Sequence, residues 1–401
     1  MLSTQTISWM PRLAFTPAQS TYQGDLLVVV FLRGAADGLN MIVPHGEASY
    51  YRQRPSLAIP RPDDRRATAS QRTIDLDGFF GLHPALQPLL PVWQAEHLAV
   101  VHACGAPDES RSHFKAMELM ERGVDSESGP ASGWIGRHLA TLDTSNGSPL
   151  RAIGVGELIQ RSLRGSVPVT ALRSIRDYHL AGDQRRTDQL RSMLSAMYQG
   201  PEAIHQTGRR TIEILDALHS LNPQQERALK ELSYPESEFG LGLHQVALLV
   251  KAEVGLEIAA LDLGGWDTHF TQGGSKGLMA NLLTQLGQGL AAFYTDMQDF
   301  VDRSSVVVMT EFGRRVSENG SLGTDHGHGS ALLLIGGNVR GRMVHGIWPG
   351  IEPDQLVGSG DLAATTDYRD VLGELCLKRL KNPVLEQIFP DHAVTIRNLF
   401  R

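Results

Sequence analysis

Cysteine is scarce in this chain of 401 residues. Cys104 and Cys376, its two cysteines, lie far apart and form no Cys-x-x-Cys pair. A framework of disulfide bonds is therefore excluded, and the redox compartment stays open.

Long apolar runs and concentrated positive charge are also missing. No apolar stretch is long enough to span a bilayer. The formal net charge is -7 and no basic block stands out, so a nucleic-acid partner is not expected. With 41% hydrophobic and 20% charged residues, the composition is that of a globular protein with a sizeable core.

The first 24 residues lack the basic region and the long apolar region of a complete signal peptide. We interpret residues 1–24 as a leader, either disordered or the remnant of an export signal. Length alone permits several domains, but large α/β folds often run this long as one unit. We therefore expect a single domain over residues 25–401.

Apolar runs alternate with helical patterns along the chain. This alternation predicts an α/β sandwich with a mainly parallel sheet, in which functional loops gather at the carboxyl ends of the strands. The predicted strands are 25–33, 97–103, 256–263, 305–310 and 330–335, with shorter ones at 151–155 and 167–171. The predicted helices are 84–93, 113–122, one or two within 183–221, 241–254, 278–301 and 373–380.

Glycine is abundant, with 41 residues, and one glycine-rich segment holds the densest cluster of metal-binding side chains. Asp325, His326 and His328 stand between glycines in residues 323–329, just before a predicted strand. Two imidazoles and a carboxylate suit a metal site. A plain surface loop is the alternative.

A second glycine loop, residues 264–270, follows the strand predicted at 256–263. Asp267 and His269 are separated by one residue, so in an extended loop both point to the same side and suit a metal. Trp266 would wall the site or stack on a substrate. Alternatively, Trp266 belongs to the core and Asp267 caps the next helix.

Two more strand ends carry polar side chains. Asp37 and Asn40 follow the first strand and suit a hard cation or a phosphate-like ligand, although a simple turn also explains Asp37. Glu311 and Arg314 follow the strand at 305–310. Arg314 can offer a planar fork to an oxyanion, and a surface salt bridge is the alternative for both.

The loop after the strand at 97–103 supplies a candidate nucleophile. Ser112 precedes a predicted helix, where backbone amides stabilise a developing alkoxide. Arg111 and His113 flank it and are candidates for holding an oxyanion. Helix capping alone would also explain a serine here.

Together these loops predict a centre of mixed oxygen and nitrogen ligands. Such a set suits zinc, manganese or magnesium, as one or two ions, and displacement at phosphorus or sulfur. The candidate ligands are Asp37, Asp267, His269, Glu311, Asp325, His326 and His328.

Several ordered motifs resemble a known bacterial family, domain of unknown function 1501. They are RGAADGLN, RSHF, GGWDTHF, TEFGR, GTDHGHG and TDYR, and the resemblance runs from about residue 25 to the C-terminus. It implies a relation to the alkaline phosphatase and sulfatase superfamily, and hence an alkaline-phosphatase-like three-layer sandwich. It also implies twin-arginine export to the periplasm or secretion. Residues 1–24 lack a complete signal for this, which keeps a cytoplasmic location open.

The resemblance also implies individual roles. Asp37 would bind one metal, Asp267 and His269 the other, and Ser112 would be the nucleophile. Where the superfamily has an Asp-His pair, this chain has Glu311 and Phe312, and a phenyl ring cannot bind a metal. Either His326 or His328 supplies the missing imidazole, or one metal site is lost.

The sequence thus favours a metal-dependent hydrolase acting on a small-molecule or glycan ester of phosphate or sulfate. A formylglycine sulfatase is not expected, because no Cys-x-Pro-x-Arg sequence is present. The alternatives are a non-catalytic exported protein that binds a glycan or another anion, and a purely structural metal. The sequence does not determine the oligomeric state.

Overall fold

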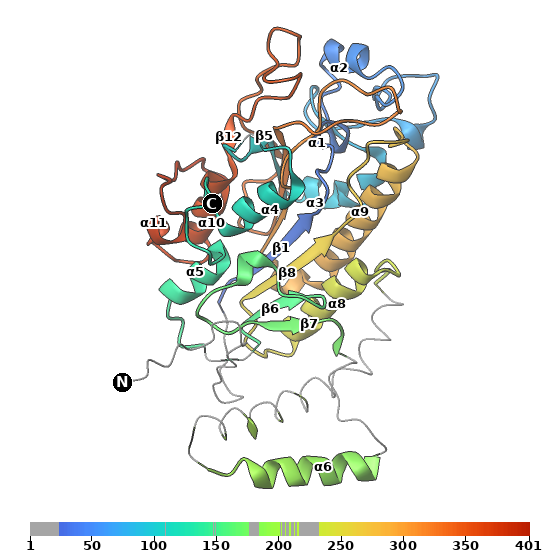
Figure 1. Ribbon diagram of the computed structural model, residues 1–401. Coiled ribbons are helices and arrows are strands. Elements are labelled where there is room, and N and C mark those ends of the chain that lie inside the picture. The colour runs from blue at the N-terminus through green and yellow to red at the C-terminus, as the bar shows by residue number, and fades with distance from the viewer. Residues whose placement is uncertain are drawn as a thin grey trace.

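The computed structural model describes residues 24–401 except 109, 147, 149, 176–183, 201, 203–204, 206–207, 210–211, 213–214 and 216–231 (Figure 1). The leader predicted for residues 1–24 therefore lies almost wholly outside the described residues. So does much of the helical region predicted within residues 183–221.

A large mixed sheet forms the centre of the molecule (Figure 1). Its strands run in the order β11-β5-β10-β9-β1-β8-β6-β7, and β12 pairs with β5. All pairings are parallel except those of β10, which is antiparallel to both β5 and β9. The strands are β1 Leu26–Leu32, β5 Leu98–Gly105, β6 Ala152–Val155, β7 Thr170–Leu172, β8 Ile258–Leu263, β9 Ser304–Met309, β10 Ser330–Ile335, β11 Met343–His345 and β12 Thr366–Asp367.

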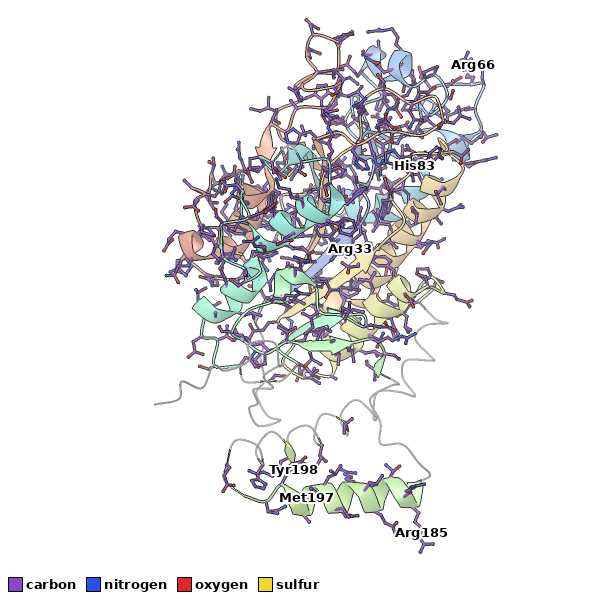
Figure 2. The ribbon with its side chains drawn as sticks, in the orientation of Figure 1. Arg33, Arg66, His83, Arg185, Met197 and Tyr198 are labelled. Atoms are coloured by element: carbon purple, nitrogen blue, oxygen red, sulfur yellow. The ribbon has the colours of Figure 1, made fainter. Side chains whose placement is uncertain are left out.

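Helices cover both faces of this sheet. The first strand shows this division, because Val28 and Val30 pack into one core while Leu27 and Val29 pack into another. The first core is completed by α3 Leu90–Gln94, α8 Glu238–Lys251 and α9 Leu278–Asp296, and the second by α4 His113–Arg122, α5 Trp134–Thr141, α10 Tyr368–Lys378 and α11 Leu385–Ile388. Side chains fill the space between these layers (Figure 2). The predicted α/β sandwich with a mainly parallel sheet is confirmed.

The predicted strands match β1, β5, β6, β7, β8, β9 and β10, because continuous apolar runs suit strands buried on both faces. The helix predicted at 113–122 coincides with α4. The segment predicted at 84–93 is a 3₁₀-helix, η2 Pro84–Leu89, followed by α3. Pro88 lacks the amide that a continuous helix would use.

Most of the remaining elements are short, and α6 Gln184–Met197 lies within the helical region predicted at residues 183–221. A small antiparallel sheet, in the order β2-β4-β3, contains β2 Ile42–Val43, β3 Ile74–Asp75 and β4 Gly81–Leu82. The other helices are α1 Gly38–Met41, α2 Ala48–Gln53 and α6 Gln184–Met197, and the other 3₁₀-helices are η1 Ala69–Gln71, η3 Arg161–Leu163 and η5 Gln298–Arg303. Among the described residues, no helix combines the length and the apolar character needed to cross a membrane.

Candidate metal centre

The reversed direction of β10 brings two sets of loops to one edge of the sheet. The loops after β1, β5, β8 and β9 leave at the carboxyl edge because these strands are parallel to one another. Since β10 is antiparallel to β5 and β9, its amino end at Ser330 lies at that same edge. Residues 323–329 precede β10 and therefore meet the other candidate loops.

One carboxylate oxygen lies at the centre of this meeting point. The Oδ1 atom of Asp267 is 3.3 Å from Nε2 of His113, 3.1 Å from Nε2 of His269 and 3.2 Å from Nε2 of His326. These residues come from α4, the loop after β8 and the loop before β10. Three imidazoles thus point the same ring atom at one carboxylate.

The opposite ring nitrogen of each imidazole faces an oxygen atom. His113 Nδ1 is 2.7 Å from Glu311 Oε1, and His326 Nδ1 is 2.8 Å from the backbone carbonyl of Arg111. His269 Nδ1 is 3.4 Å from Asp325 Oδ1. An acceptor at Nδ1 fixes the tautomer that leaves the Nε2 lone pair free, as in metal-binding histidines.

This tautomer makes one contact unfavourable without a cation. His269 Nε2 and His326 Nε2 are 2.9 Å apart. If both Nδ1 atoms carry the proton, two lone pairs face each other at hydrogen-bond distance. In addition, His113 Nε2 is buried and has no hydrogen-bond partner among the described residues. A bound cation would satisfy all three nitrogens.

Three of these residues, His113, Asp267 and His326, form a group close enough to hold one metal ion. Zinc bonds of about 2.0–2.1 Å place neighbouring ligand atoms about 3.3 Å apart. Ligand atoms of His113, Asp267 and His326 all lie within 4.8 Å of one another, and those of His269 and His326 are closer still. Two imidazole nitrogens and one carboxylate oxygen suit zinc better than magnesium.

A buried arginine fixes the position of Asp267. Arg314 is 1% exposed and its Nη2 donates to Asp267 Oδ1 at 2.7 Å. Burial raises the pKa of Asp267, but the hydrogen bond from Arg314 and the contact with His326 outweigh burial and lower it to about 2. The carboxylate is therefore ionised at neutral pH. Arg314 also donates to the carbonyls of Gly34, Ala35, Trp266 and Thr324.

Glu311 supports His113 in a similar way. It is 1% exposed, and it accepts hydrogen bonds from the backbone of Gly34 at 2.9 Å and from the Thr310 hydroxyl at 3.0 Å. The hydrogen bond to Glu311 raises the pKa of His113. Burial raises the pKa of Glu311, but the hydrogen bond from His113 and those from the backbone lower it overall. Glu311 thus orients an imidazole, and its contact is to Nδ1 rather than to the atoms at the centre.

Phe312 forms an apolar wall beside the centre. Its ring stacks on that of His113 with centroids 5.0 Å apart, and it lies 5.1 Å from the ring of His326. Phe312 is 4% exposed and packs with Ala35 and Ala116. Burial lowers the pKa of His326, which favours the neutral, ligating form.

Asp37 lies in a separate buried network. Its Oδ2 accepts from Arg54 at 2.6 Å and from Gln272 at 2.6 Å. The structure thus supplies Asp37 with a guanidinium as its counter-cation. Its role as a metal ligand stays a prediction. The Oδ1 atom is buried, and no hydrogen-bond partner for it lies in the part of the chain that the structure describes.

The other two residues of the 323–329 loop predicted as ligands lie around the centre rather than in it. Asp325 contacts His269, and a hydrogen bond from Asn319 lowers the pKa of its carboxyl. His328 directs Nε2 to the carbonyl of Ala106 at 2.7 Å. Of the two histidines, His326 alone reaches Asp267.

The three residues predicted to act in catalysis near α4 have different environments. Ser112 is the exposed N-cap of α4, and its side chain makes no capping hydrogen bond. Arg111 pairs with Asp361 at 2.6 Å, while its carbonyl holds His326. The sequence predicts that His113 holds an oxyanion, whereas in the structure its Nε2 lies 3.3 Å from Asp267 Oδ1, in the candidate metal-binding group. The RSHF motif was a signal for this role that sequence reasoning missed.

Trp266 belongs to the core. It is 1% exposed and its Nε1 donates to the carbonyl of Leu263 at 2.9 Å. The stacking role suggested for Trp266 is therefore wrong, because its ring is buried.

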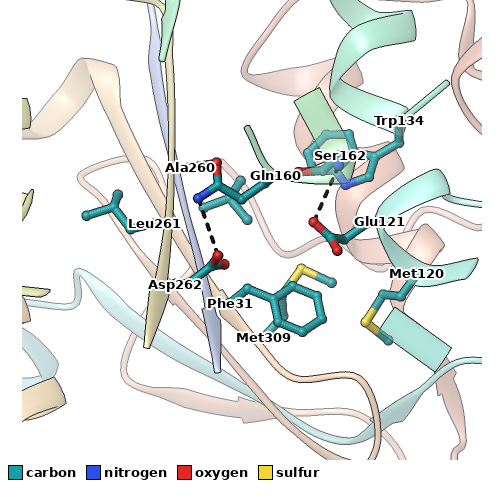
Figure 3. Close-up of a pocket in the computed structure, with 11 residues that line it drawn as sticks. Phe31, Met120, Glu121, Trp134, Gln160, Ser162, Ala260, Leu261, Asp262 and Met309 are labelled. Carbon is teal, nitrogen blue, oxygen red and sulfur yellow. Dashed lines mark hydrogen bonds between the residues drawn. The ribbon is translucent and has the colours of Figure 1, made fainter. Parts of the chain in front are cut away.

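A pocket lies beside the sheet at a different place (Figure 3). It is lined by residues that include Glu121, Asp262 and Gln160, and by none of the residues around Asp267. Arg33 bridges Glu121 at 3.1 Å and Asp262 at 2.9 Å. This ion-pair network belongs to the packing of α4 against the sheet.

The chain is similar to a known protein family and to a solved structure. The family model described as protein of unknown function (DUF1501) matches residues 25–373. None of the curated proteins matches the chain. Among solved structures, the chain is similar to a protein in the alkaline phosphatase superfamily from Vibrio parahaemolyticus. The two share 11% sequence identity with a TM-score of 0.34, over 86% of this chain and 68% of that chain.

Proposed function

The chain belongs to the DUF1501 family, and we propose that it is a metal-dependent hydrolase of phosphate or sulfate esters. The observation that supports this most is the convergence of three Nε2 atoms on Asp267 Oδ1. Each of these imidazoles is oriented through Nδ1 by an oxygen acceptor. An arrangement of this kind costs free energy in an empty site, and binding of a metal would offset that cost.

The proposed centre holds one divalent ion, and zinc fits its ligands best. His113, Asp267 and His326 would bind it, and His269 lies beside them with its Nε2 2.9 Å from that of His326. A second ion near Asp37 is disfavoured, because Arg54 already places a positive charge 2.6 Å from that carboxylate. Phe312 provides no donor where the superfamily resemblance implies an imidazole.

The bound ion would supply Lewis-acid charge and lower the pKa of a coordinated hydroxyl group. Ser112 is the candidate nucleophile, since it precedes His113 at the start of α4 and is open to solvent. The free backbone amides of that first turn favour negative charge. Arg111 would bind an ester oxygen, because its side chain is 34% exposed although paired with Asp361.

Elemental analysis and turnover assays test this proposal together. The purified full chain should contain close to one equivalent of metal. Dialysis against a chelator should abolish hydrolysis of aryl phosphates or aryl sulfates, and zinc or manganese should restore it. Stoichiometric metal with no turnover of any ester would exclude the hydrolase.

A non-catalytic protein with a metal in the same place is the second candidate. The environment of Arg314 favours it. This guanidinium donates to four backbone carbonyls and to Asp267, so it offers little to a substrate oxyanion. In that case the metal would hold three loops together, and its removal would lower thermal stability while ester turnover was absent throughout.

A further inference from the structure

One buried carboxylate outside the candidate ligand set is joined to the centre through a neighbouring residue. Asp361 is 3% exposed, and its Oδ2 accepts a hydrogen bond from Arg111 Nη2 at 2.6 Å. The backbone carbonyl of Arg111 lies 2.8 Å from His326 Nδ1. Asp361 is therefore linked, through Arg111, to an imidazole whose Nε2 faces Asp267.

The segment that carries Asp361 is held in place by its own backbone. Val357 and Asp361 exchange two backbone hydrogen bonds across a turn, at 2.9 and 3.0 Å. Directly after the turn, the carbonyl of Leu362 accepts a hydrogen bond from Gly329 N at 2.8 Å. Gly329 ends the loop that contains His326. The carboxylate thus has a fixed position relative to that loop.

The loop that carries Arg111 has few other anchors. Among the described residues of 106–111, no backbone group bonds to another backbone group. The start of α4 fixes the chain from Ser112 onward. Before that point, the guanidinium of Arg111 is held by Asp361 and by the Ser359 hydroxyl at 3.3 Å. The position of the Arg111 carbonyl therefore depends on the ion pair.

A second arginine makes a looser contact with the same carboxylate. Arg315 Nε is 4.0 Å from Asp361 Oδ1, and its Nη1 is 3.8 Å from Asp325 Oδ2. Asp325 in turn faces His269 Nδ1 at 3.4 Å. Because the contact of Asp361 with Arg111 is much shorter, the path through Arg111 should dominate.

From these contacts we infer that Asp361 is a positioning residue of the candidate centre. It holds Arg111, whose carbonyl keeps the proton of His326 on Nδ1 and so leaves Nε2 free to bind a cation. An ion pair on the open surface would contribute little, but the side chain of Asp361 is only 5% exposed. This role rests on the proposed metal centre and deepens it, because Asp361 would act on a ligand without touching the ion.

Nitrogen NMR of the metal-free full chain tests this role without turnover and without a bound ion. Ring-nitrogen shifts, assigned with His326→Ala, report which nitrogen of His326 carries the proton at about pH 8, where imidazoles are neutral. The wild type should carry it on Nδ1. Asp361→Asn keeps the shape of the side chain but removes its charge, and it should give a mixture of both tautomers. Glu352→Gln is the matched control, since it removes a carboxylate from the exposed pair with Arg52.

Zinc affinity, measured by competition with a chromophoric chelator, gives a second readout. Asp361→Asn and Arg111→Ala should each lower it about tenfold, as expected for a partner that orients a ligand. The double variant should lose no more than either single variant, because both changes break the same link. Arg111 is partly exposed, so Arg111→Ala tests the link even if Asp361→Asn fails to fold.

The outcomes separate this role from the proposed function. A wild-type proton on Nε2 of His326, or a tautomer unchanged in both Asp361→Asn and Arg111→Ala, would overturn it. Losses of zinc affinity that add in the double variant would also overturn it, because the two residues would then act separately. A His326 tautomer that depends on Asp361, in a protein without ester turnover, would support the positioning role while the hydrolase failed.

Discussion

His269 and His326 face each other through their Nε2 atoms at 2.9 Å, although they stand 57 residues apart in the chain. The opposite ring nitrogens face oxygen atoms: Nδ1 of His269 faces Asp325, and Nδ1 of His326 faces the carbonyl of Arg111. This close approach of two ring nitrogens beside Asp267 leads to the first prediction.

His326→Ala should lower the affinity for zinc by at least about 100-fold, because it removes a nitrogen that faces Asp267. His328→Ala is the matched control, since His328 lies two residues away and directs its Nε2 to the carbonyl of Ala106. Competition titration with a chromophoric chelator measures both variants. Equal losses in the two would contradict the assignment of His326 as the ligand.

Glu311→Gln should lower zinc affinity about 10- to 100-fold, since the glutamate orients His113 without reaching the centre. Glutamine has the same shape but lacks the negative charge. The same titration measures the effect, and circular dichroism verifies that the variant is folded. An unchanged affinity would contradict a role for the Glu311 charge in metal binding by His113.

Ser112→Ala should abolish ester hydrolysis while the metal content stays at the wild-type value. The serine side chain makes no capping hydrogen bond, so the free energy of unfolding should change by less than about 0.5 kcal/mol. Turnover assays measure the loss of hydrolysis, and urea denaturation measures the free energy of unfolding. A variant that keeps wild-type turnover would remove Ser112 from the mechanism.

Arg314→Ala should destabilise the protein by about 3 kcal/mol, because it removes a buried hydrogen-bond donor from the half-exposed carboxylate of Asp267. Four backbone carbonyls also lose the hydrogen bonds that Arg314 donates to them. Urea denaturation of the metal-free protein measures the loss. Arg52→Ala is a suitable control, since the Arg52–Glu352 pair is exposed and should contribute little.

Lowering the pH should decrease the free energy of unfolding, because two buried histidines are neutral in the folded protein. Burial lowers the pKa of both His83 and His102 to about 4, from 6.5 when exposed. Each Nδ1 accepts a backbone amide, from Ala85 and Ala103, and each Nε2 faces a carbonyl, so the neutral ring fits. The unfolded chain therefore binds more protons between pH 6.5 and about 4.

Stability should accordingly be complete above pH 6.5 and fall as the pH decreases toward 4, by about 1 kcal/mol per pH unit for each histidine. Urea denaturation from pH 7.5 to 5 measures this slope. His102→Gln should reduce the slope, whatever its effect on absolute stability. A slope equal to that of the wild type would contradict the assignment of His102 as a neutral buried group.

The sequence by itself determined the strands and most of the long helices. Continuous valine-rich and leucine-rich runs such as Leu26–Leu32 can bury both faces only in a covered sheet, so local composition is sufficient. It also determined that Asp267, His269 and His326 stand in loops at strand ends. These assignments depend on residue type and short spacing.

Only the tertiary structure decided which of those side chains meet. A loop that precedes a parallel strand would lie at the wrong edge of the sheet, and the antiparallel pairing of β10 brings His326 to Asp267. The pairing of Asp37 with Arg54, and the inward direction of His113 beside outward Ser112, likewise depend on packing between distant segments. Sequence spacing carries no information about these contacts, because strand direction and helix rotation are set by the core that the whole chain buries.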